Sequence, residues 1–121
     1  MELTKAEEQI MQILWGLEKG FVKDILEHFK DPKPAYTTVA TIVKILERKG
    51  FVNHKVYGNS YQFFPIITKS DYSKIYLKDV LNKHFKNSIK DVVSFFVDNN
   101  EVRTKDIDEA IQLLTKLKKR G

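Results

Sequence analysis

Apolar residues in the first part of the chain recur every three or four positions, the spacing that places them on one face of a helix. The first such stretch follows Thr4 and Glu7, which have the spacing of a capping box, and we expect it to end at Gly20. A shorter amphipathic stretch then runs up to the prolines of segment 31–34, which disfavour helix. The pattern predicts two helices here.

A third amphipathic stretch has apolar residues on one side and polar residues on the other. We expect this helix to start at Thr37 or Thr38, with a threonine as its cap, and to stop at Gly50. The side chains on its outer side are short and polar near the start of the helix and basic towards its end. The residues of that side and its flanks are Thr37, Thr38, Thr41, Lys44, Ile45 and Arg48.

The pattern then changes to that of a β-hairpin. Segments 51–56 and 60–64 are rich in strand-forming residues, and the turn between them contains Gly58 and Asn59. Pro65 closes the second strand. Three helices followed by a hairpin are the order of a winged helix-turn-helix, which the sequence therefore predicts.

Beyond the hairpin the pattern is helical to the end of the chain. Thr68 starts a long helix that reaches about Lys86, and Ser88 starts another that residues 98–100 interrupt. Thr104 is expected to cap the last helix. Three amphipathic helices are therefore predicted after the hairpin.

Composition fits a folded chain without cysteine chemistry. Of 121 residues, 42% are hydrophobic and none is cysteine, which removes disulfides and thiolate zinc sites. We predict an α+β, mostly α fold, with a winged helix-turn-helix domain over residues 1–69 and a helical domain over residues 70–121. No apolar run approaches the roughly 20 residues that span a bilayer, and the N-terminus has no signal pattern, so we expect no membrane insertion and a cytoplasmic location.

Positive charge is concentrated in the middle of the sequence. The formal net charge is +5; segment 30–70 alone carries +5, residues 1–29 carry −3 and residues 71–121 carry +3. The peak covers the third helix and the hairpin, the two elements with which a winged helix-turn-helix meets DNA. Charge and element order together predict double-stranded DNA as the partner.

Candidate DNA-contacting side chains precede the third helix, lie on it, or lie on the hairpin. Threonine hydroxyls can contact phosphates or bases, and basic side chains can bind phosphate oxygens or guanine. Each type also has a purely structural interpretation: helix caps, a solvated face, or hairpin packing. The candidates are Lys33, Tyr36, Thr37, Thr38, Thr41, Lys44, Arg48, Lys55, Tyr57 and Asn59.

The sequence contains no pattern typical of an enzyme or a metal site. It has no glycine-rich phosphate loop, no serine elbow and no nucleophile placed with a base. His28, His54 and His84 lie far apart, without paired carboxylates at ligand spacing, and are interpreted as structural or surface residues. We expect no enzymatic activity, no cofactor and no metal.

Several short segments resemble the penicillinase-repressor family (BlaI/MecI/CopY). They are residues 3–7, 13–15, 37–46 and 49–50, and the hairpin strand with Tyr61 before Pro65. The resemblance is strongest over residues 3–65 and continues more loosely to about Leu117.

This resemblance implies a winged-helix domain joined to a helical dimerisation domain, two copies of which bind a palindromic operator and repress genes. It makes Thr38, Thr41 and Lys44 on the third helix the leading contacts. The three C-terminal helices are also more than the core of so small a monomer needs, which favours an interface between two copies. The expected dimer-interface residues are Leu77, Leu81, Phe85, Val92, Val93, Phe96, Ile107, Ile111, Leu114 and Leu117.

The resemblance also suggests how repression ends. In the resistance branch of the family a signal-activated protease cuts a bond that aligns with Phe95 and Phe96, where asparagine is usual at the position of Phe95. The copper branch carries a C-terminal cysteine motif that this chain lacks. The resemblance thus suggests a protease as a partner and gives no copper site.

We predict a homodimeric transcriptional repressor that binds a palindromic operator through its third helix and wing. One alternative is a winged-helix protein–protein interaction module, which would tolerate charge reversal at Lys44 and Arg48. Another is an architectural DNA binder, which would bind random and operator duplexes alike. A third is a helical scaffold whose C-terminal half recruits a partner.

Overall fold

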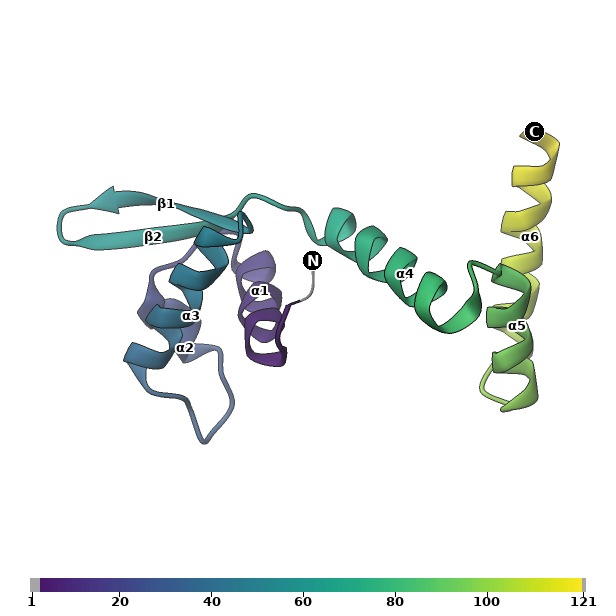
Figure 1. Ribbon diagram of the computed structural model, residues 1–121, viewed down its shortest axis with the longest axis horizontal. Helices are drawn as coiled ribbons and strands as arrows, with labels where there is room; N and C mark the ends of the chain where they lie inside the picture. The colour runs from purple at the N-terminus through teal and green to yellow at the C-terminus, as the bar shows by residue number, and fades with distance from the viewer. Residues whose placement is uncertain (1–2, 121) are drawn as a thin grey trace. The chain divides into compact units, whose positions relative to one another are not determined.

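The computed structural model describes residues 3–120 as six helices and one two-stranded sheet (Figure 1). The predicted order of three helices, a hairpin and three helices is confirmed, and with it the mostly helical winged-helix fold class. In chain order the elements are α1 (Lys5–Leu17), α2 (Val22–Glu27), α3 (Tyr36–Arg48), β1 (Val52–Tyr57), β2 (Ser60–Pro65), α4 (Lys69–Phe85), α5 (Ile89–Asp98) and α6 (Thr104–Arg120).

The first helix, α1, begins with the predicted capping box. Thr4 Oγ1 accepts a hydrogen bond from the Glu7 N–H at 3.1 Å, and Glu7 Oε1 accepts one from the Thr4 N–H at 2.8 Å. The helix ends at Leu17, before the predicted stop at Gly20, because Glu18 takes a φ of 70°. The position of the stop was therefore wrong.

Gly20 instead joins the loop after α1 to the hairpin. Its N–H donates to the Phe63 carbonyl at 2.9 Å, and the Phe63 N–H donates back to the Gly20 carbonyl at 2.8 Å. This isolated β-bridge pairs Gly20 with the edge of β2 that does not face β1. It fixes the base of the wing to the junction between α1 and α2.

The start of α3 corrects a second expectation. The helix begins at Tyr36 with Ala35 as its N-cap, so neither Thr37 nor Thr38 is the cap. The extended backbone of Ala35 lets its carbonyl accept from the N–H groups of Thr38 at 3.1 Å and Val39 at 3.2 Å. Both threonine side chains are therefore free of a capping role and lie within the first turn.

The hairpin has the predicted strands, with β1 displaced by one residue and β2 starting at Ser60 as predicted and extending one residue further, to Pro65. Antiparallel pairing runs from Val52 opposite Pro65 to Tyr57 opposite Ser60. Gly58 takes a φ of 60° in the turn, a conformation that suits glycine. In Figure 1 the hairpin extends beyond the helices that support its base. Burial follows this arrangement, because the buried strand residues lie near that base.

The core of the winged helix gathers one face of each of its helices. Val39, Val43 and Leu46 of α3 are fully buried, and each such aliphatic side chain stabilises the fold by about 2 kcal/mol. The remaining buried apolar residues come from α1, α2, the strands, the residue before β1 and the start of α4. They are Ile10, Met11, Leu14, Val22, Ile25, Phe51, Val52, Phe63 and Tyr72.

The chain divides into two compact units, Met1–Tyr76 and Leu77–Gly121. The first turns of α4 belong to the first unit because Tyr72 is buried and its ring lies 5.5 Å from that of Trp15. Trp15 Nε1 also donates to the Ile67 carbonyl at 2.9 Å. The boundary expected after residue 69 coincides with the start of α4, a few residues before the division between the units.

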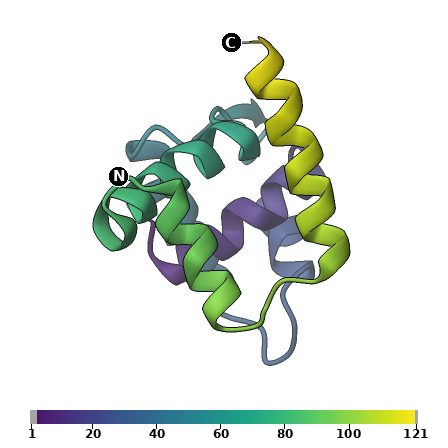
Figure 2. The same ribbon diagram turned by 90° about the vertical axis from the view of Figure 1, so that its right-hand side faces the viewer.

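In the second unit, α5 runs to the loop that joins it to α6, and α6 runs back in roughly the opposite direction (Figure 2). Ser88 Oγ caps α5 by accepting from the Asp91 N–H at 3.1 Å, as predicted. The predicted cap of α6 was wrong, because Thr104 is the first residue of that helix and the Arg103 carbonyl accepts from the Ile107 N–H at 3.1 Å. Within residues 89–98 and 104–120 the two helices contain no buried residue.

Candidate nucleic-acid interface

The outer side of α3 is fixed by the burial of its inner side. Because Val39, Val43 and Leu46 are fully buried, the helical period turns Thr41 and Lys44 outwards. All ten candidate DNA contacts predicted from the sequence are exposed. Exposure is the first requirement for a contact with DNA, and every candidate meets it.

The polar groups on this side of α3 have few partners within the protein. Thr41 Oγ1 donates to the Thr37 carbonyl at 2.9 Å, which leaves its oxygen lone pairs available as acceptors. Among residues 3–120, Lys44 and Arg48 make no intramolecular ion pair. These two cations are therefore available to a partner such as a phosphate oxygen.

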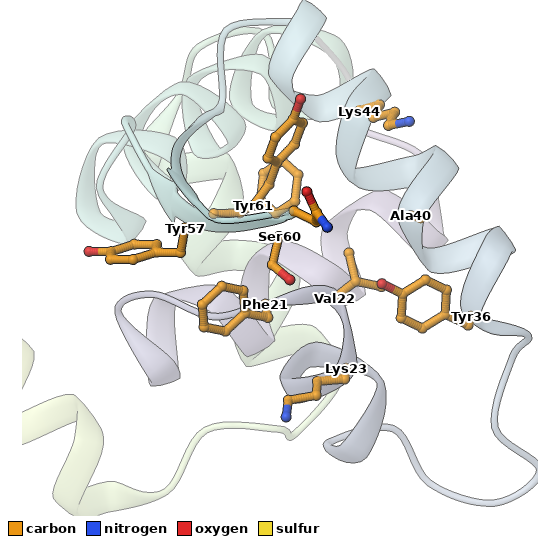
Figure 3. Close-up of a pocket in the computed structure, with 11 residues that line it drawn as sticks. Phe21, Val22, Lys23, Tyr36, Ala40, Lys44, Tyr57, Ser60 and Tyr61 are labelled. Carbon is orange, nitrogen blue, oxygen red and sulfur yellow. The ribbon is translucent and has the colours of Figure 1, made fainter.

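A hollow of about 650 Å³ lies between α2, α3 and the wing (Figure 3). Tyr36 at the start of α3 and Tyr57 near the wing tip stand on opposite sides of it, with Phe21 between them. The lining residues are Phe21, Val22, Lys23, Tyr36, Ala40, Lys44, Tyr57, Asn59, Ser60, Tyr61 and Phe63. The fold thus brings together candidates that lie far apart in the sequence.

A second hollow, of about 430 Å³, lies between the later turns of α3 and the strands. Its lining residues are Thr41, Lys44, Glu47, Arg48, His54, Tyr61 and Phe63. Lys44 lines both hollows, so it stands at the centre of the surface between helix and wing. The other candidates, Lys33, Thr37, Thr38 and Lys55, line neither hollow.

The wing tyrosines combine packing with exposure. The rings of Tyr57 and Phe21 lie in an edge-to-face arrangement with their centres 6.0 Å apart, and Tyr57 remains 52% exposed. Tyr61 stacks on His54 with ring centres 4.3 Å apart. The packing interpretation of these side chains therefore holds, and Tyr57 still presents about half of its surface to a partner.

Lys49 differs from its basic neighbours on α3. Its Nζ lies 2.8 Å from Oε1 of Glu7, a side chain that is only 5% exposed. Burial raises the pKa of Glu7, but the hydrogen bonds from Lys49 and from the Thr4 N–H and the charge of Lys49 outweigh it, so the pKa lies below its ordinary value of 4.5. Lys49 therefore anchors the end of α3 to the start of α1.

Two groups of the candidate interface were not identified from the sequence. Lys23 lines the larger hollow, and its signal in the sequence was a basic residue in the first turn of the helix before α3. Glu47 and His54 meet across the second hollow, where His54 Nδ1 contacts Glu47 Oε1. No sequence signal joins a helix residue to a strand residue in this way.

The described residues offer no metal site and no membrane-spanning helix. Within residues 3–120 there is no group of three or more His, Asp or Glu side chains that could hold a metal ion. In the same range no helix is both long and apolar enough to cross a membrane.

An exposed basic helix on a three-helix core, with a hairpin beside it, defines a winged helix-turn-helix protein. Solved structures agree on this fold. The solution structure of the DNA-binding domain of the repressor BlaI matches with a TM-score of 0.52 at 24% identity, covering 59% of this chain and 88% of that one. BpsR of Bordetella bronchiseptica matches with a TM-score of 0.51 at 12% identity, covering 98% and 76%.

The family model described as "Penicillinase repressor" matches residues 3–116, and the chain belongs to that family. The methicillin resistance regulatory protein MecI of Staphylococcus aureus (strain N315) is 27% identical over 118 residues, 95% of this chain and 94% of the relative. The penicillinase repressor of Bacillus licheniformis is 24% identical over 120 residues, 98% and 94%. The protein is thus a DNA-binding transcriptional repressor, from a family that is not one of enzymes.

Proposed function

We propose that the protein acts as a homodimer that represses transcription by binding a palindromic operator in the cytoplasm. One observation carries the DNA-reading part: α3 buries one side completely and exposes hydroxyl and basic side chains on the other. In a winged helix-turn-helix that outer side enters the major groove, and the wing lies along the neighbouring backbone or minor groove.

The contacts of this complex divide by chemistry. Thr38 and Thr41 lie in the first half of α3, where side chains reach base edges, and they are proposed to read sequence. Lys44 and Arg48 follow on the same side and are proposed to bind phosphates or guanine. The remaining proposed contacts flank the helix or lie on the wing, and they are Lys33, Tyr36, Thr37, Lys55, Tyr57 and Asn59.

Dimerisation is supported by apolar surface that a single chain leaves exposed. Val93 of α5 is 52% exposed, and Ile111, Leu114 and Leu117 of α6 are each more than half exposed. Apolar side chains of α4 and α5 also line a hollow of about 370 Å³, among them Leu77, Leu81, Phe85, Val92 and Phe96. A second copy would bury these surfaces, which monomers of this size rarely expose together.

Charge along α6 favours a second copy as the occupant. The helix carries Asp106, Asp108 and Glu109 near its start and Lys116, Lys118, Lys119 and Arg120 near its end. Two α6 helices in antiparallel arrangement would place the acidic start of one beside the basic end of the other. A two-fold axis between the copies would then match a palindromic operator.

A signal-activated protease is the remaining partner that the resemblance suggests. Phe95 and Phe96 are 49% and 40% exposed and lie inside α5. Their rings contact each other, and Phe95 also contacts Phe85. We propose that cleavage at this bond would need α5 to unwind, because its peptide groups are engaged in helical hydrogen bonds.

Selection from a random duplex library, followed by gel shifts at two salt concentrations, tests the DNA-reading proposal. We expect a palindromic motif bound about 10³-fold more tightly than a scrambled duplex, with affinity falling steeply with salt. Equal binding of both duplexes would indicate an architectural protein. Unchanged behaviour of Lys44→Glu and Arg48→Glu in the cell, with no binding to either duplex, would indicate a protein-binding module.

A further inference from the structure

Glu47 is the one carboxylate among the described residues that line the two hollows. Its side chain is 34% exposed, so solvent screens it only in part. DNA is a dense line of negative charge, and a carboxylate on the surface that meets it weakens binding unless a cation balances it. A cation that could balance Glu47 therefore has to come from the side chains near it.

His54 on β1 faces Glu47 across the boundary between wing and helix. Its Nδ1 contacts Glu47 Oε1, and its ring stacks on Tyr61 with an interplanar angle of 16°. The ring of Phe63 lies on another side, 5.7 Å away between ring centres. The imidazole is therefore held in place between β2 and α3 and is only 24% exposed.

The charged groups around this pair come from α3 and β1. Lys44 and Arg48 of α3 line the same hollow, and Lys55 follows His54 on its strand. From β2, the hollow is lined by Tyr61 and Phe63. Neither Lys44 nor Arg48 pairs with Glu47 among the described residues, so the imidazole of His54 is the group in contact with its carboxylate, and both cations stay available to phosphates.

We propose that His54 is a positioning residue of the DNA interface, which takes up a proton when DNA binds and thereby holds the wing against α3 through Glu47. This proposal rests on the proposed DNA binding. With Nδ1–H donating to Glu47, the added proton comes from solvent and is held on Nε2. The added proton brings one more positive charge to the Glu47–His54 pair as the phosphates approach.

Binding linked to the uptake of one proton strengthens as the pH falls, by at most tenfold per pH unit. Fluorescence anisotropy with a labelled random duplex and with the selected duplex, at constant salt, measures this between about pH 8 and pH 6, where histidine ordinarily changes charge. We expect the wild-type protein to bind both duplexes roughly fivefold or more tightly at the lower pH. Calorimetry in two buffers of different ionisation enthalpy should show net proton uptake.

Two conservative variants separate this role from a structural one. Glu47→Gln removes the carboxylate, so we expect tight binding at both pH values. His54→Gln leaves the carboxylate unbalanced, so we expect weak binding at both. The double variant His28→Gln/His84→Gln is the matched control, because both histidines are exposed and neither lines the hollows, and it should keep the wild-type response. Circular dichroism at each pH verifies folding.

The proposal is overturned if Glu47→Gln keeps the wild-type pH response, if the control variant loses it, or if calorimetry detects no proton uptake. The two duplexes separate this result from the proposed function. A pH response without preference for the selected duplex supports the role of His54 and contradicts operator reading. A preference for the selected duplex without a pH response supports operator reading and contradicts the role of His54. Absence of binding to either duplex at low salt contradicts both proposals.

Discussion

The carboxylate of Glu7 and the ammonium of Lys49 lie 2.8 Å apart, joining the first turn of α1 to the residue that follows α3. The carboxylate is buried and also accepts from the Thr4 N–H. This contact fixes the end of the proposed reading helix to the start of the domain. Its effect on stability can be measured separately from DNA binding.

Glu7 should make stability depend on pH in the acid range. Its pKa is lower in the folded protein than its ordinary value of 4.5, so its contribution is fully present above that value and is lost as the pH falls through the folded pKa. Glu7→Gln should cost about 1–3 kcal/mol at neutral pH and flatten this dependence. Urea unfolding at several pH values measures both, with exposed Glu101→Gln as control. Identical acid profiles for the two variants would contradict the assignment.

Thr41→Ala and Lys44→Ala should affect DNA binding in different ways. Loss of a base contact at Thr41 should weaken binding to the selected operator by about 1–3 kcal/mol and leave random DNA almost unchanged. Loss of a phosphate contact at Lys44 should weaken both and lower the salt slope by about one. Titrations at several salt concentrations distinguish these outcomes, with Lys90→Ala on α5 as control. If neither variant alters operator affinity, the proposed contacts are wrong.

Leu114→Glu should separate the two copies without unfolding the chain. Leu114 is 57% exposed on α6, so a charge there is tolerated in a monomer but not inside an apolar interface. Sedimentation equilibrium should then show a monomer with an unchanged circular dichroism spectrum. Gln112→Glu, an exposed polar position on the same helix, is the control and should remain dimeric. A Leu114→Glu protein that stays dimeric would show that Leu114 lies outside the dimer interface.

Two glycines should respond oppositely to alanine. Gly50 follows α3 with a φ of 84°, so Gly50→Ala should destabilise the fold by about 1 kcal/mol through backbone strain alone, since nothing lies within 4 Å of the added Cβ. Gly16 lies inside α1 with the same open space, so Gly16→Ala should stabilise by about 0.5 kcal/mol. Thermal unfolding of both variants measures the difference, and equal shifts would contradict the backbone argument.

Local patterns predicted most of the fold, because helix period, capping pairs and the hairpin turn depend on neighbouring residues. The Thr4–Glu7 box, the Ser88 cap and the Gly58 turn are examples. The predicted start of α3 was wrong for a reason that is also local. Helix α3 begins after Ala35, whose side chain has no oxygen that could cap the helix. Because the side-chain preferences of N-cap residues do not favour alanine, they could not predict this start.

The interface was only partly predictable for a physical reason. Exposure of the ten candidates follows from the helical and strand periods, which a sequence displays. The contacts between elements do not, because Glu7–Lys49, Glu47–His54 and Gly20–Phe63 join residues far apart along the chain or on different elements. Such pairs depend on the three-dimensional packing, and of these three the Glu47–His54 pair lies on the surface between α3 and the wing.

The Gly20–Phe63 bonds also bear on self-association of the DNA-free protein. A hairpin that projects into solvent offers unpaired N–H and carbonyl groups along its edges, and these can nucleate pairing with another chain. Val56 and Tyr61, opposite each other on the strands, are 61% and 45% exposed and add apolar surface there. Gly20 occupies the edge of β2 only at Phe63. Gly20 therefore blocks strand pairing along β2 near the base of the wing. The outer half of the wing keeps the hazard, which Lys55 and the tight turn oppose and which bound DNA would cover.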